Sequence, residues 1–275
     1  MGTITLEIVD TQGKVKAYSN DKEVGKELKR TAKDMVYLAG ADFVYEEGDK
    51  ICITLDEENT YLIAQLDEAL APTLIYLKGK VWEYVVPVEE KTREAYSKKV
   101  FSGNTHYLSV RVASKEERKM YRNLALNPHD QKEESGAYPH AYANVETRND
   151  STFFARNAID GVYANESHGA YPYQSWGINQ QADAALTLEF GRSVEIDKIG
   201  LVLRGDYPHD SWWKEVEFVF SDGSKEVIKP KKVHEVQYFE ITPRIVESLV
   251  FCNLIKADDA LFPALTQVEI YGKEA

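Results

Sequence analysis

The chain has 275 residues, which is the length of two ordinary domains rather than one. It contains 33 Lys and Arg against 45 Asp and Glu, a formal net charge of −12, so we expect neither nucleic acid nor an anionic membrane surface as a partner. Hydrophobic residues make up 43% and charged residues 28%, which is typical of a globular protein and excludes a disordered chain.

Two further observations concern the compartment. The chain contains only two cysteines, Cys52 and Cys252, so it cannot carry a disulfide framework. No run of about 18 apolar residues occurs, and the N-terminus lacks the basic start and apolar run of a secretory signal. We therefore expect a cytoplasmic protein, or an extracellular one if a signal peptide has been removed.

Alternating apolar and polar residues predict strands throughout the first half of the chain. The predicted strands are Ile4–Val9, Ile51–Leu55, Tyr61–Ile63, Thr73–Leu77, Val81–Val86 and Leu108–Val112. The strands on either side of Lys78-Gly79-Lys80 are predicted to form a hairpin. One segment differs: the residues from Asp21 to about Lys33 are rich in Lys and Glu, with Val24 and Leu28 four positions apart, which predicts a short surface helix.

A linker-like stretch, 127–140, separates the halves, and Ser114–Tyr121 has room for a helical turn or two just before it. The second half then returns to the alternating pattern. Its predicted strands are Leu186–Phe190, Ile199–Leu203, Val216–Phe220, Phe239–Ile241, Leu249–Ile255 and Val268–Ile270. Many short strands joined by turns predict an all-β protein of two β-sandwich domains, which we place at 1–120 and 121–275.

Five sequence pieces in the second half carry a family resemblance. In order they are Phe153–Gly161, Ser175–Gly177, Leu186–Gly191, Phe220–Gly223 and Val268–Gly272. The ordered set resembles the discoidin family, also called the coagulation-factor C-type domains, which includes galactose-binding-like carbohydrate-binding modules. The resemblance covers about 121–272 and implies an eight-stranded jelly roll. The chain departs from the family at Glu189, where Asp is usual, and in the long insertion 162–174. The first domain resembles no family that we can name.

The resemblance also implies a structural calcium ion. The matching positions are Asp160 in its Asp-Gly loop, Ser175 in place of a common Thr, and Glu269. Carboxylate and hydroxyl oxygens suit a hard cation of this kind. The alternative is an ordinary Asp-Gly turn that holds no metal.

The loop 168–176 is the first candidate for ligand binding. It crowds His168, Tyr171, Tyr173 and Trp176 into nine positions. Sugar rings present C–H faces that stack on aromatic rings and hydroxyls that need polar partners. We expect Trp176 to be a core residue, as its family counterpart usually is, and the other three to face a ligand.

Two more loops carry candidate ligand residues. The preferred loop connects two predicted strands and contains Arg204, Asp206, His209, Asp210 and Trp212. A third candidate lies before the last strand and contains the adjacent carboxylates Asp258 and Asp259, followed by Phe262 and Pro263. The alternative for both loops is that their charges pair with one another or are simply solvated.

These observations favour a non-catalytic carbohydrate-binding protein that recognises a mono- or oligosaccharide through loops at one end of the C-terminal jelly roll. No Gly-x-Ser-x-Gly elbow, P-loop or HExxH motif occurs, and we assign no catalytic residue. Two alternatives stay open. One is a sugar-active hydrolase with a site between the domains that uses His129, Asp130, His168 or His209. The other is a protein-interaction module, with a homo-oligomer as one form of it.

Overall fold

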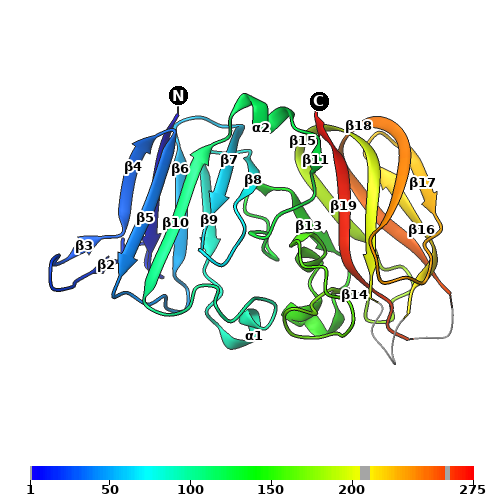
Figure 1. The fold of residues 1–275 in the computed structure, drawn as a ribbon, viewed down its shortest axis with the longest axis horizontal. Helices are drawn as coiled ribbons and strands as arrows, with labels where there is room; N and C mark the ends of the chain where they lie inside the picture. Colours follow the sequence, from blue (N-terminus) through cyan, green and yellow to red (C-terminus); the bar gives the residue numbers. More distant parts are fainter. Residues whose placement is uncertain (1, 205–210, 258–260) are drawn as a thin grey trace. The chain divides into compact units, whose positions relative to one another are not determined.

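The computed structural model describes residues 2–204, 211–257 and 261–275, and the chain divides into two compact units (Figure 1). Unit 1 comprises 1–114 and 133–137, and unit 2 comprises 115–132 and 138–275. The chain therefore leaves unit 1 after Ser114 and returns to it for five residues before it completes unit 2. Strands dominate both units, which confirms the prediction of an all-β protein.

Unit 1 contains two main sheets. The first has the order β4-β1-β6-β9, with β4 at Lys29–Lys33, β1 at Thr3–Val9, β6 at Lys50–Leu55 and β9 at Val81–Val85. The second has the order β12-β8-β7-β10-β5, with β12 at Ala137–Tyr138, β8 at Thr73–Leu77, β7 at Thr60–Gln65, β10 at Thr105–Val112 and β5 at Met35–Ala41. A two-stranded ladder of β2 (Ala17–Tyr18) and β3 (Lys26–Glu27) and the helical turn α1 (Glu90–Arg93) complete the unit.

The core of unit 1 follows the alternation seen in the sequence. Ile4, Leu6 and Ile8 on β1 are fully buried, while the residues between them are partly exposed. Their partners across the sheet include Ile53, which is also fully buried. One face of β1 therefore supplies the apolar contacts that hold the unit together.

The helix predicted from Asp21 to about Lys33 is wrong. This segment contains β3 and β4, and β4 pairs antiparallel with β1. Val24 is 90% exposed and Leu28 is 2% exposed, so the two residues do not share one buried face as the helical spacing required. Gly25 adopts a φ of 64°, a left-handed conformation that favours a turn over a continuous helix.

The hairpin predicted around Lys78-Gly79-Lys80 is also wrong. The two strands exist, but β8 pairs with β7 while β9 pairs with β6 in the other sheet. The Lys78 N–H donates to Gly136 O at 3.1 Å, and Lys80 O accepts from the Leu55 N–H at 2.8 Å. The residues before and after Gly79 therefore bond to different backbone segments, and the chain passes from one sheet to the other at this turn.

Unit 2 begins with the short helix α2 (Lys115–Lys119), as the sequence predicts. Its main sheet has the order β11-β19-β15-β18-β16-β17, while β13 pairs with β15 and β14 pairs with β19. The strands are β11 (Arg122–Asn123), β13 (His140–Ala143), β14 (Trp176–Gly177), β15 (Leu186–Leu203), β16 (Trp213–Phe220), β17 (Lys225–Ile228), β18 (Gln237–Lys256) and β19 (Ala264–Glu274). Three short 3₁₀ helices lie between β13 and β14, namely η1 (Thr147–Asn149), η2 (Ser151–Phe153) and η3 (Ala155–Ile159).

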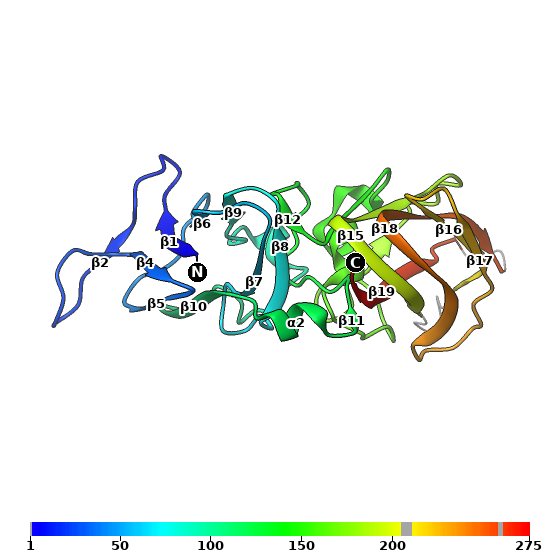
Figure 2. The ribbon, with the colours of Figure 1, turned by 90° about the horizontal axis from the view of Figure 1, so that it is seen from above.

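The long strands β15 and β18 lie side by side (Figure 2) and organise the core of unit 2. Register shifts interrupt their pairing, so each strand bends. Trp176, Trp213 and Phe251 are fully buried, and Phe251 makes edge-on contacts with both indole rings. The expectation that Trp176 belongs to the core is confirmed, and its indole N–H donates to Val145 O at 2.9 Å.

A largely buried ionic cluster fastens the last strand of unit 2. Glu274 on β19 accepts hydrogen bonds from Nε and Nη2 of Arg192, each at 2.8 Å, and from Nη2 of Arg122 at 2.5 Å. Nearby, β19 approaches β15 so closely that a Cβ on Gly272 would lie 2.0 Å from the carbonyl oxygen of Glu195. Charge pairing and close backbone contact therefore both fix the position of β19.

Among the residues that the structure describes, no helix is long and apolar enough to cross a membrane.

Candidate functional site

A pocket of about 240 Å³ opens in unit 2 where several connecting segments meet. Its lining comes from η1, from the turn after β14, from the end of β15 and from the segment before β19. The lining residues are Thr147, Arg148, Phe153, His168, Gly177, Ile178, Asn179, Arg204, Phe262, Pro263 and Ala264. Two residues that the sequence predicts for ligand binding, His168 and Arg204, therefore lie in one cavity.

One wall of the pocket depends on close contact between η1 and β14. Thr147 Oγ1 accepts a hydrogen bond from the Asn179 N–H at 2.9 Å. A Cβ at Gly177 would lie 2.7 Å from the same hydroxyl oxygen, so only glycine allows this approach. The Thr147 side chain therefore fixes this wall of the pocket against the backbone of Gly177 and Asn179.

Arg204 is a buried, charged residue of the pocket lining. The residue is 5% exposed, its Nη2 donates to Phe262 O, and its backbone N–H donates to Ala264 O at 3.1 Å. These bonds fix the guanidinium beside the segment that precedes β19. The ring of Phe262 remains 47% exposed, so a buried cation and an accessible aromatic ring line the same cavity.

Arg148 and His168 add polar groups at the exposed side of the pocket. The Arg148 guanidinium lies 5.4 Å from the ring centroid of Phe153, and Arg148 has a φ of 55°. His168 is exposed. The described lining contains no carboxylate, so the charged groups that it presents are cationic although the whole chain is acidic.

The other predicted ligand residues fall into two groups. Tyr171 is exposed and Tyr173 is half-buried, and neither belongs to the described lining. Trp212 is half-buried and, together with Arg204, lines a separate and very narrow depression. There the Lys232 ammonium lies 5.4 Å from the centroid of the Trp212 ring. The remaining predicted ligand residues, Asp206, His209, Asp210, Asp258 and Asp259, lie outside the described residues.

The predicted calcium ligand Asp160 is buried and accepts three amide hydrogen bonds. Its Oδ1 accepts from the Val162 N–H and from Gln267 Nε2, each at 2.8 Å, and its Oδ2 accepts from Gln174 Nε2 at 2.7 Å. Burial raises the pKa of Asp160 to about 6, although the neighbouring Arg156 and the amide donors favour the ionised form. The sequence does not suggest the two glutamines as partners for this carboxylate.

The other two predicted calcium ligands have different surroundings. Glu269 is buried, and its carboxylate accepts from the hydroxyls of Tyr163 and Tyr271, the latter at 3.3 Å. The Ser175 hydroxyl is buried and has no hydrogen-bond partner among the described residues. Asp160 and Glu269 therefore bind separate protein groups, and the calcium site stays a prediction.

Two residues of the hydrolase alternative, His129 and Asp130, lie inside unit 2. Both are buried, and the Asp130 carboxylate pairs with His140 Nδ1 at 2.8 Å and accepts from the Ala141 N–H at 2.9 Å. Burial raises the pKa of Asp130, while His140 opposes that rise. These contacts give Asp130 a role in fixing the start of β13.

The comparisons with known proteins concern the fold. No protein-family model and no curated protein matches the chain. Three of the solved structures that resemble it are a chitosan-binding module of a chitosanase/glucanase from Paenibacillus sp. IK-5, a fucose-binding module of Streptococcus pneumoniae, and a family 32 carbohydrate-binding module of C. perfringens NanJ in complex with galactose.

Their sequence identities to this chain are 15%, 14% and 16%, and their TM-scores are 0.38, 0.40 and 0.37, in the same order. They cover 56%, 55% and 48% of this chain, and 100%, 98% and 91% of their own chains. All three are carbohydrate-binding modules by name, the class that the resemblance to the discoidin family implied. A likeness of this size carries no argument about the ligand of this chain.

Proposed function

We propose that the chain binds a carbohydrate through the pocket of unit 2, without chemical turnover. The observation that supports this proposal is the combination of an accessible Phe262 ring with the fixed guanidinium of Arg204 in one small cavity. Sugars need both kinds of contact, because each ring has apolar C–H faces and a rim of hydroxyls.

The two kinds of contact have different energetic roles. Stacking of a sugar face on Phe262 contributes about 0.5–1.5 kcal/mol, by analogy with aromatic pairs. A hydrogen bond from a charged donor such as Arg204 contributes about 1.5–3 kcal/mol. After the cost of association, sites of this kind bind with roughly micromolar to millimolar affinity, about −8 to −4 kcal/mol.

The size of the pocket favours a single sugar unit. Its volume of about 240 Å³ is below the range of about 300–1,000 Å³ that is typical of pockets for drug-sized ligands. A monosaccharide, or the terminal unit of an oligosaccharide, matches this volume better than a buried chain of sugars. The remainder of an oligosaccharide would contact the surrounding loops.

The lining favours binding over hydrolysis. Glycosidases use a pair of carboxyl groups on either side of the bond that breaks. The described lining offers Arg148, His168 and Arg204 as its ionisable side chains and contains no Asp or Glu. Cationic groups also favour sugars that carry a carboxylate, so uronic acids belong in any ligand panel.

The test is calorimetric titration of the full chain with galactose, fucose, N-acetylglucosamine and galacturonic acid, after a glycan array has selected larger ligands. Phe262→Ala and His168→Ala change exposed side chains of the pocket, and Tyr171→Ala is the matched control because it changes an exposed side chain outside the lining. We expect the two pocket variants to bind about two- to tenfold more weakly, a loss of about 0.5–1.4 kcal/mol for each contact, with unchanged melting temperatures.

Two results would contradict this proposal. Wild-type affinity in both pocket variants would exclude the pocket, and loss of binding in Tyr171→Ala alone would place the site on loop 168–176 instead. Release of reducing sugar from a panel of glycosides would contradict only the claim that binding occurs without turnover.

A further inference from the structure

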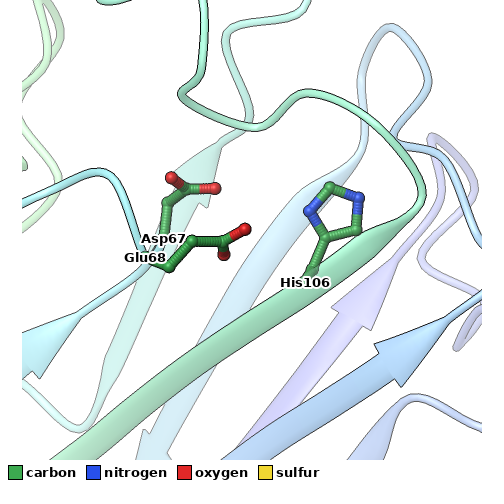
Figure 3. A group of neighbouring side chains, drawn as sticks. All are labelled: Asp67, Glu68 and His106. Carbon is green, nitrogen blue, oxygen red and sulfur yellow. The ribbon is translucent and has the colours of Figure 1, made fainter.

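Unit 1 contains a compact group of three side chains that can bind a metal. Asp67, Glu68 and His106 each place one ligand atom within 4.8 Å of the others. Figure 3 shows the imidazole ring of His106 facing the two carboxylates across a short gap. The three residues come from two places far apart in the sequence, so their convergence is a product of the fold.

The pairing of β7 with β10 brings these residues together. Gln65 lies opposite Ser109 in the antiparallel register, and continuing this register past the end of β7 places Glu68 opposite His106. Asp67 is held by backbone donors, since Oδ1 accepts from the Ala69 N–H at 2.8 Å and Oδ2 from the Phe101 N–H at 2.9 Å. Each carboxylate oxygen retains a further lone pair for a metal.

His106 is the unusual member of the group. It is only 3% exposed, and neither of its ring nitrogens has a hydrogen-bond partner among the described residues. The ring packs against both Phe43 and Tyr45, with a centroid distance of 4.7 Å to each. A buried imidazole without a partner costs free energy unless something outside the protein occupies its lone pair.

We propose that Asp67, Glu68 and His106 bind a divalent transition-metal ion, with Zn²⁺ as the best match. Zinc accepts imidazole nitrogen together with carboxylate oxygen, whereas Ca²⁺ and Mg²⁺ prefer oxygen ligands alone. A dication also offsets the repulsion between two adjacent carboxylates, one of which is 2% exposed. The neutral imidazole and two carboxylates leave the occupied site without net charge.

The geometry requires only a small rearrangement. Zinc–ligand bonds of about 2.1 Å in a tetrahedron put the ligand atoms about 3.4 Å apart, so the group must contract by about 1.4 Å at most. Glu68 can supply this movement, because its side chain is exposed and its contact with the Tyr107 N–H is long, at 3.2 Å. Asp67 and His106 are buried and need not move far.

The site is accessible from solvent. Glu68 and His106 both line a pocket of about 530 Å³ on the surface of unit 1, together with residues of β5 and β10 and of the β2–β3 region. Three protein ligands leave a fourth zinc position for water or for a group that enters this pocket. The arrangement is therefore that of an open metal site rather than a closed structural one.

The experiment is a calorimetric titration of the metal-free full chain with ZnCl₂. Glu68→Gln removes one charge and keeps an acceptor oxygen, and His106→Phe replaces the imidazole with a ring that suits its aromatic neighbours. Glu58→Gln and His234→Ala are matched controls at exposed positions outside the group. We expect one zinc ion per wild-type chain and per control chain. Loss of a group that hydrogen-bonds to a metal ligand weakens binding about 10–100-fold, so loss of a ligand itself should weaken it by at least about a hundredfold.

A second measurement keeps the test decisive if His106→Phe fails to fold. In a chain labelled with ¹⁵N-histidine, Zn²⁺ should shift the ring signals of His106 before those of the exposed His234. Stoichiometric binding that survives Glu68→Gln and leaves the His106 signals unchanged would overturn the proposal. So would wild-type affinity weaker than about 1 mM, or a preference for Ca²⁺ or Mg²⁺ over Zn²⁺.

Discussion

Replacing Glu274 by Gln tests how far one carboxylate fastens the last strand of unit 2. Glu274 is the common partner of Arg122 and Arg192, and the three side chains are between 7% and 19% exposed. Removing its charge leaves two guanidinium groups together in a poorly solvated place. The change preserves shape, so the effect reports the charge rather than packing.

The expected loss can be estimated from burial. Removing one partner of a buried ion pair costs about 3–5 kcal/mol. The Glu274 side chain is 13% exposed, and a Gln in its place retains one acceptor oxygen. We therefore expect a loss of stability at the lower end of this range, about 3 kcal/mol. In a unit of about 150 residues each kcal/mol lowers the melting temperature by about 2–4 °C, which gives about 6–12 °C.

Tryptophan fluorescence during thermal unfolding is a suitable assay. Three of the four tryptophans, Trp176, Trp212 and Trp213, lie in unit 2, so the signal reports mainly on that unit. Glu195→Gln is the matched control, because Glu195 pairs with Lys273 at 3.1 Å on the exposed surface of the same strand pair. Breaking this exposed pair should cost less than about 1 kcal/mol.

The pH dependence provides an independent check of the reasoning. Burial raises the pKa of Glu274, but Arg192 and Arg122 lower it by more, so the folded pKa lies below its usual value. A depressed carboxyl pKa contributes stability above the unfolded pKa of about 4.3, and this stability is lost as the pH falls through the folded pKa. The difference between wild type and Glu274→Gln should therefore shrink below about pH 4.3. Two results would contradict this reasoning. One is an equal loss of stability in Glu274→Gln and in the control Glu195→Gln. The other is a difference in stability between wild type and Glu274→Gln that stays constant as the pH falls.

Two further predictions concern packing in unit 2. Trp213→Ala should cost about 3–5 kcal/mol in the same unfolding assay, because the side chain is fully buried, whereas Trp212→Ala should cost less; equal losses would contradict the assigned core. Gly272→Ala should lower the yield of folded protein or the melting temperature sharply, because its Cβ would meet the Glu195 carbonyl oxygen. Gly79→Ala, where a Cβ meets nothing within 4 Å, should leave both nearly unchanged, and the reverse order would be incompatible with this close contact.

Local patterns were sufficient to predict most strands but not how those strands pair. Alternation along β1 and β15 reflects one buried face, and this signal is local. The partners of β8 and β9 are not local, so the spacing around Gly79 looked like a hairpin although the strands belong to different sheets. The Lys- and Glu-rich segment that ends with β4 likewise looked helical, because a short exposed edge strand has a similar composition.

The candidate pocket was predictable only in part, for a related reason. His168 and Arg204 lie in loops whose composition already indicated a ligand, and the fold brings both to the pocket. The other polar lining residues, Thr147, Arg148 and Asn179, lie in ordinary polar turns. Arg148 and Asn179 have positive φ values, which could not be predicted from the residue types in this part of the sequence. The group around His106 was missed because its carboxylates lie almost forty positions earlier in the chain.

The five-residue return of the chain to unit 1 has a consequence for separating the two halves. Segment 133–137 supplies the Gly136 carbonyl that accepts from the Lys78 N–H, and β12 adjoins β8 at the edge of the five-stranded sheet. A polypeptide that stopped at Ser114 would leave β8 as a bare edge strand, a template for aggregation. Truncation at the apparent domain boundary is therefore a poor way to isolate unit 1, and a version that appends 133–137 through a short flexible linker would keep that edge covered.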